Sequence, residues 1–78
     1  MKLIQVLGPG CAKCKALESN AHEAVKQSGI EAQIEKISDI ATITAFGVMM
    51  TPALVVDGEV KMMGKVAGVD EIKKILAG

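Results

Sequence analysis

The sequence is nearly free of aromatic residues: Phe46 is the single one, and tryptophan and tyrosine are absent. Proteins that bind single-stranded nucleic acid stack its bases on aromatic side chains, so this chain has almost nothing for that purpose. An excess of charge is lacking as well, because nine basic residues balance nine acidic ones. A neutral chain has no electrostatic reason to bind nucleic acid or an anionic membrane surface. We therefore expect neither partner.

Long hydrophobic runs are also missing. No apolar stretch approaches the roughly 18 residues of a membrane-spanning helix, and glycine and proline interrupt the opening MKLIQVLGPG too early for a signal peptide. We expect a cytoplasmic protein. The length of 78 residues allows one small domain, residues 1–78, and a chain with half of its residues hydrophobic is typical of a globular protein rather than a disordered one. Cysteine is scarce, and cytosolic thiols are normally reduced. The two cysteines, Cys11 and Cys14, are therefore expected to be catalytic or metal-binding rather than a structural disulfide.

The spacing of apolar residues predicts seven elements in the order β-α-β-α-β-β-α. The expected strands are 2–7, 30–37, 53–56 and 59–63, and the expected helices are 11–28, a short one capped by Ser38 or Asp39, and one opened by Asp70. The first β-α-β should be a right-handed parallel unit, and Asp57-Gly58 is typical of a two-residue hairpin turn. We expect an α/β protein with a four-stranded mixed sheet and helices on both of its faces.

The cysteine pair follows a Gly-Pro-Gly loop, at the point where the first strand gives way to a helix. The first N–H groups of a helix lack internal partners and the helix dipole is positive there, so a thiolate at Cys11 is favoured over a thiol. Lys15 lies four residues further along, on the same helical face. Together these effects are expected to lower the pKa of Cys11.

Cys14 lies one helical turn after Cys11. Side chains at this spacing are about 5–6 Å apart, and a disulfide needs Cα atoms about 4.4–6.8 Å apart. So short a loop adds little stability to the fold, which favours a bond that opens and closes. We expect Cys11 to attack a partner's disulfide and Cys14 to resolve the mixed disulfide. The alternative is that both cysteines are small buried apolar residues.

Thr51-Pro52 precedes the strand ALVV. Proline is poorly tolerated inside a sheet, so Pro52 should begin a strand or lie at an edge. Its peptide bond can be cis or trans, and the sequence alone favours trans. Met50, next to this pair, is a candidate for an adaptable docking surface.

With the cysteine pair, Thr-Pro, the Asp-Gly hairpin and the closing helix, the whole chain resembles the thioredoxin superfamily, and most closely its small redox-active disulfide proteins. The resemblance implies a minimal thioredoxin-like fold, a cis Pro52 that faces the cysteines, and an exposed nucleophile at Cys11. It also implies a thiol–disulfide oxidoreductase, an electron carrier without a cofactor. There are departures. The site reads Gly-Cys-Ala-Lys-Cys rather than Trp-Cys-Gly-Pro-Cys, and KLIQVL holds no carboxylate to assist the resolving cysteine.

The main alternative is a Cu(I) carrier, because cysteine and methionine suit that ion. Domains of that kind usually follow the order β-α-β-β-α-β and give no role to Thr-Pro, and Pro9 occupies the place of their usual methionine. A dimer that shares Cys11 around a metal centre is a third hypothesis. We expect a monomer without metal that acts on disulfide-containing proteins. The sequence does not identify its reductant, although a faint likeness to glutaredoxins suggests glutathione.

Overall fold

The computed structural model describes residues 2–10 and 12–77. Its elements follow the predicted order and are β1 (Lys2–Leu7), α1 (Ala12–Ser28), β2 (Ala32–Ile37), α2 (Ile40–Ala45), β3 (Ala53–Val56), β4 (Glu59–Met63) and α3 (Val69–Ala77). Two boundaries differ from the predictions. Strand β2 begins two residues later than expected, because the chain is still leaving the Gly29 turn, where φ is 67°. Helix α3 begins at Val69, since Ile72 N–H already bonds to the Gly68 carbonyl.

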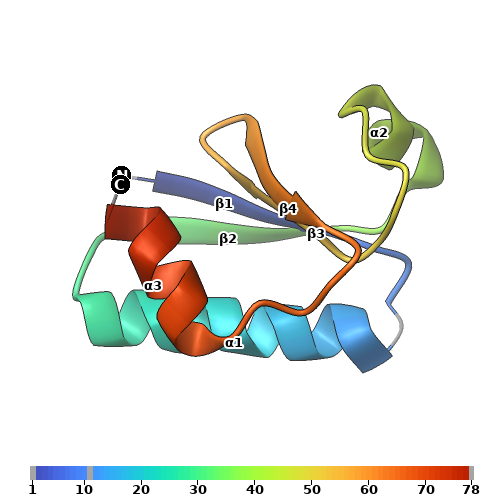
Figure 1. The fold of residues 1–78 in the computed structure, drawn as a ribbon. Helices are drawn as coiled ribbons and strands as arrows, with labels where there is room; N and C mark the ends of the chain where they lie inside the picture. The colour runs from blue at the N-terminus through green and yellow to red at the C-terminus, as the bar shows by residue number, and fades with distance from the viewer. Residues whose placement is uncertain (1, 11, 78) are drawn as a thin grey trace.

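The four strands form one mixed sheet in the order β2-β1-β3-β4 (Figure 1). Strands β1 and β2 are parallel, whereas β3 is antiparallel to both β1 and β4. The turn between β3 and β4 has φ of 52° at Asp57 and 82° at Gly58. Two consecutive positive φ angles are what this class of hairpin turn requires. The predicted sheet is thus confirmed.

Helices cover both faces of the sheet, as predicted: α1 and α3 lie on one face and α2 lies on the other (Figure 1). Side chains alternate along a strand, so each central strand contributes residues to the core layers on both faces of the sheet. The layer under α1 and α3 is built on Ile4, Val6, Leu17, Leu54 and Ile72, all of them buried. The layer under α2 is built on Leu7, Ile43, Val48, Ala53 and Val55. Burial on both sides explains why ALVV is an unbroken apolar run.

The short helix α2 is fixed at its start by Asp39 rather than Ser38. The Asp39 carboxylate accepts hydrogen bonds from Thr42 N–H at 3.0 Å and from Thr42 Oγ1 at 2.6 Å. These bonds hold the pKa of Asp39 below its usual value.

In the part of the chain that the structure describes, no helix is long and apolar enough to cross a membrane.

Candidate functional site

The sheet brings the Gly-Pro-Gly loop and Thr51-Pro52 together. Leu7, the last residue of β1, pairs with Ala53, the first residue of the antiparallel strand β3. Gly8 directly follows Leu7 and Pro52 directly precedes Ala53, so Gly8 and Pro52 lie opposite each other. Gly8 N–H also donates a hydrogen bond of 2.8 Å to the Ile37 carbonyl at the end of β2. Three strand ends thus converge just before α1 begins.

Cys14 fills the space between these strand ends. A Cβ atom added to Gly8 would overlap the Cys14 sulfur, and it would lie 3.1 Å from Cys14 Cβ and 3.9 Å from Pro52 Cα. The sulfur is therefore packed directly on the bare backbone of Gly8, beside Pro52. Cys14 is only 2% exposed and Pro52 is fully buried. Only glycine at position 8 leaves room for this arrangement.

The bond between Thr51 and Pro52 is cis, which confirms that part of the prediction. The Pro52 carbonyl accepts a hydrogen bond of 2.9 Å from Gly64 N–H. Thr51 itself is exposed. Met49 and Met50, the two residues before it, are 92% and 57% exposed. Pro52 is therefore buried beside Cys14, whereas the apolar residues Met49 and Met50 just before Thr51 are exposed.

Cys11 lies outside the described residues, so its predicted exposure and its pairing with Cys14 remain predictions. The residues on both sides of it are described. Gly10 has φ of 94°, a conformation that favours glycine. Ala12 begins α1, and Lys13 and Lys15 are exposed in its first turn. That turn holds no acidic residue, so nothing there offsets the positive end of the helix dipole.

Comparison with known proteins agrees with this geometry. The family described as "Thioredoxin domain" matches residues 2–77. A thioredoxin of Methanothermobacter thermautotrophicus is 53% identical over 77 residues, which cover 99% of this chain and 100% of the relative. A thioredoxin of Methanocaldococcus jannaschii is 37% identical over 76 residues, with 97% and 87% of the two chains covered. The chain belongs to the thioredoxin family.

Membership confirms the predicted minimal thioredoxin-like fold and makes the chain a redox protein of the thioredoxin type, a disulfide oxidoreductase in general terms. The Cu(I)-carrier alternative has no support in these relatives. Within residues 2–10 and 12–77, no three His, Cys, Asp or Glu side chains gather into a metal site. The expectation that the chain works without a metal remains a prediction.

Two residues of this thioredoxin-family site escaped the sequence analysis. The sequence indicates Gly8 only as part of a loop, although its position opposite Thr-Pro in the strand pairing determines the packing of Cys14. Lys36 had no signal at all, yet its Nζ lies 3.8 Å from where a Cβ on Gly10 would be. Both contacts join segments far apart in the sequence, and local patterns do not reveal such contacts.

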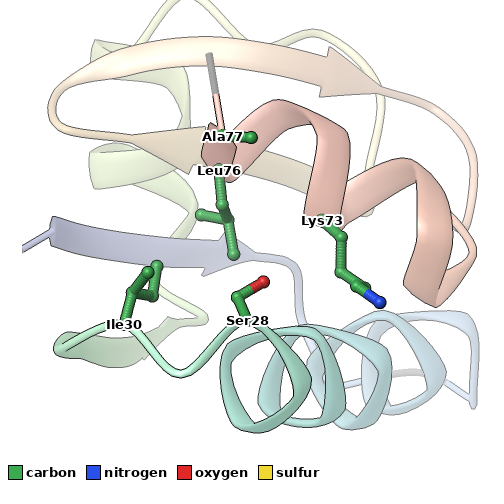
Figure 2. Close-up of a pocket in the computed structure, with 5 residues that line it drawn as sticks. All are labelled: Ser28, Ile30, Lys73, Leu76 and Ala77. Atoms are coloured by element: carbon green, nitrogen blue, oxygen red, sulfur yellow. The ribbon is translucent and has the colours of Figure 1, made fainter.

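A pocket of about 260 Å³ lies at the other end of α1, lined by Ser28, Ile30, Lys73, Leu76 and Ala77. Figure 2 shows Leu76 and Ser28 pointing into the gap between α3 and the end of α1. Ser28 is 14 residues after Cys14, or about 20 Å along the helix at about 1.5 Å per residue. The pocket is therefore remote from the thioredoxin site.

Proposed function

We propose that this thioredoxin-family chain, acting as one domain over residues 1–78, reduces disulfides through Cys11 and Cys14. The observation that supports this most directly is the placement of Cys14. Its sulfur is buried on Gly8 beside the cis Pro52, one turn into a helix whose positive end faces the same place. A thiol so enclosed is poorly placed to meet an external disulfide. It is well placed to attack a sulfur held at Cys11.

The proposed reaction is two successive thiol–disulfide exchanges. The Cys11 thiolate attacks one sulfur of the partner's disulfide, and the other partner sulfur leaves as a thiolate that takes up a proton. The Cys14 thiol then gives up its proton and attacks the Cys11 sulfur of the mixed disulfide, which closes the Cys11–Cys14 disulfide and releases the second partner sulfur as a thiolate that takes up a proton. The chain loses two electrons and two protons, and the partner gains them. A thiol such as glutathione, or a flavoprotein reductase, must restore the dithiol.

Three neighbouring residues are proposed to support the cysteines. Lys15 is exposed in the first turn of α1, where its ammonium favours a thiolate at the helix start. Pro52 forms the buried wall beside Cys14. Thr51 is exposed next to that wall, so a partner that presents its disulfide there meets Thr51 and the adjacent Met50. We propose disulfide-containing proteins as the partners of a cytoplasmic monomer.

The roles of the cysteines are tested by trapping. Cys14→Ser leaves the attack intact and removes the resolving thiol, so mixed disulfides with partner proteins should accumulate and should disappear with dithiothreitol. Cys11→Ser removes the attacking thiol, so few adducts should form. The two variants are compared in a non-reducing pull-down from cell extract, with Cys11→Ser as the matched control. Equal yields of adducts would contradict the assigned roles, and stoichiometric Cu(I) on the native protein without any adduct would contradict the oxidoreductase.

A further inference from the structure

Three lysines belong to the segments that meet where the Gly-Pro-Gly loop enters α1, and we call them the basic rim: Lys13, Lys15 and Lys36. Lys13 and Lys15 are the second and fourth residues of the helix, within about 5 Å of its start along the axis. Lys36 comes from the end of the edge strand β2, and its Nζ lies 3.8 Å from the Cβ position of Gly10. Gly10 directly precedes Cys11 in the chain. The third ammonium group therefore reaches the site from a different element.

The charge of the basic rim is not neutralised within the part of the chain that the structure describes. None of its three lysines takes part in an ion pair or a side-chain hydrogen bond there, whereas Lys2, Lys61 and Lys65 each pair with a carboxylate. The carboxylates nearest to the rim along the chain are engaged elsewhere, with Glu18 near His22, Glu35 on Gln5 and Asp39 on Thr42. A chain without net charge thus presents three lysines beside its site that form no ion pair with a carboxylate within the described residues.

We propose that the basic rim selects disulfide partners that carry acidic side chains beside the disulfide. This inference rests on the proposed function and names the class of partner on which that function acts. A partner has to bring its sulfur to Cys11, so its neighbouring residues pass close to the three ammonium groups. Opposite charges raise the rate of encounter and like charges lower it. The selection therefore acts on the first exchange, before the mixed disulfide forms.

The test uses three peptides that differ only in charge. Each has one cysteine with two residues on either side, which are all glutamate, all glutamine or all lysine, and the cysteine is joined by a disulfide to 4-thiopyridine. Attack by the reduced protein on the peptide sulfur releases 4-thiopyridone, which is followed by its absorbance. Cys14 then displaces the peptide as a thiol. The quantity of interest is the ratio of second-order rates for the acidic and the basic peptide, because the intrinsic reactivity of the nucleophile cancels in that ratio.

At about 0.01 M salt, where screening extends over about 30 Å, the acidic peptide should react roughly tenfold faster than the basic one. At about 0.5 M salt the ratio should fall below about two. Replacing all three rim lysines by glutamine should lower the low-salt ratio at least about threefold, and Lys36→Gln alone should account for part of that decrease. Glutamine at Lys26, Lys73 and Lys74 removes the same charge at the far ends of α1 and α3, so it serves as the control and should leave the ratio unchanged.

Two outcomes overturn the selection by the basic rim. In one, the native protein reacts with all three peptides at equal rates that salt does not change. In the other, the control variant lowers the ratio as much as the rim variant does. Either result would leave the oxidoreductase standing, because the neutral peptide is still reduced. No Cys11-dependent reaction with any peptide would instead overturn the proposed function, and the selection with it.

Discussion

Gly8→Ala is the substitution that tests the packing of the site most directly. The added Cβ would overlap the Cys14 sulfur. Ordinary contacts between such atoms are about 3.5–4.0 Å, so the sulfur has to move by more than about 1 Å. Pro52 Cα lies 3.9 Å from the same Cβ position and closes one side of the space. Overpacking of this kind costs about 1–3 kcal/mol of unfolding free energy.

The cost should depend on the sulfur, which a double-mutant cycle measures. Cys14→Ala removes the overlapping atom and leaves only Cys14 Cβ at 3.1 Å, a tight contact that small shifts relieve. In that background Gly8→Ala should be close to neutral, because alanine also lowers the entropy of the unfolded chain. The coupling between the two positions should be at least about 1 kcal/mol. Urea unfolding of the four reduced proteins gives these values, and a loss of 1 kcal/mol corresponds to about 4–8 °C in the unfolding temperature at this chain length.

Gly68→Ala is the matched control, since among the described residues no atom beyond its two chain neighbours lies within 4 Å of its added Cβ. It should change the unfolding free energy by less than about 1 kcal/mol. The reasoning is refuted if Gly8→Ala costs no more than Gly68→Ala, or if its cost is the same with and without the Cys14 sulfur. A second readout concerns function. Displacing the sulfur should slow resolution, so the mixed disulfide formed by the Gly8→Ala protein should live longer than that of the native protein.

Three further predictions concern the turn between β3 and β4, the start of α2 and the surface beside the site. Asp57→Ala should lower the unfolding free energy by about 1–2 kcal/mol, because it removes the 2.9 Å hydrogen bond from Leu3 N–H and places alanine at φ of 52°. Asp57→Gly also removes the hydrogen bond but accepts this φ, so its unfolding free energy, measured with urea, should lie between those of the native protein and Asp57→Ala. The pKa of Asp39 is lowered in the folded state, so its bonds to Thr42 stabilise the fold at pH values above 3.8 and are lost as the pH falls through the lower folded pKa. The difference in unfolding temperature between the native protein and Asp39→Asn should therefore shrink between about pH 6 and pH 2.5. A difference that stays constant over this range would contradict the prediction. Met50→Ala should slow the reduction of a protein disulfide and leave the rate with dithiodipyridine unchanged, since a protein partner covers the exposed Met50 whereas a small reagent needs only the attacking thiol.

Much of the fold followed from the sequence because its signals are local. Apolar spacing identified every element in the right order, and Asp57-Gly58 identified the hairpin, since few residue pairs accept positive φ twice in succession. The boundaries were less accurate. Ile30 is apolar and partly buried against the core, so it extended the strand pattern by residues that belong to the turn after Gly29. Burial alone does not distinguish a strand from the loop that leads into it.

The site was predictable only in part, for a related reason. The cysteine spacing and Thr-Pro are visible in the sequence and indicated the chemistry. The contact of Gly8 with Cys14, and of Lys36 with Gly10, depends on which strands are neighbours and in what register. Periodicity shows which face a side chain takes, but it does not show which distant residue lies opposite. Such contacts depend on the sheet order β2-β1-β3-β4, which brings the C-terminal ends of β1 and β2 and the start of β3 to the same end of the sheet.

That convergence of strand ends also accounts for the burial of Cys14. Burying Cys14 requires a space between the end of β1 and the first turn of α1. This space exists because Gly8 has no side chain. Pro52 lies beside Cys14 because it directly precedes β3, the strand that pairs with β1. The roles proposed for the two cysteines rest on this burial of Cys14 and on the positive helix start and the basic rim one turn earlier. In the proposed mechanism, the difference in role between the two cysteines therefore depends on the backbone at Gly8 as much as on the cysteines themselves.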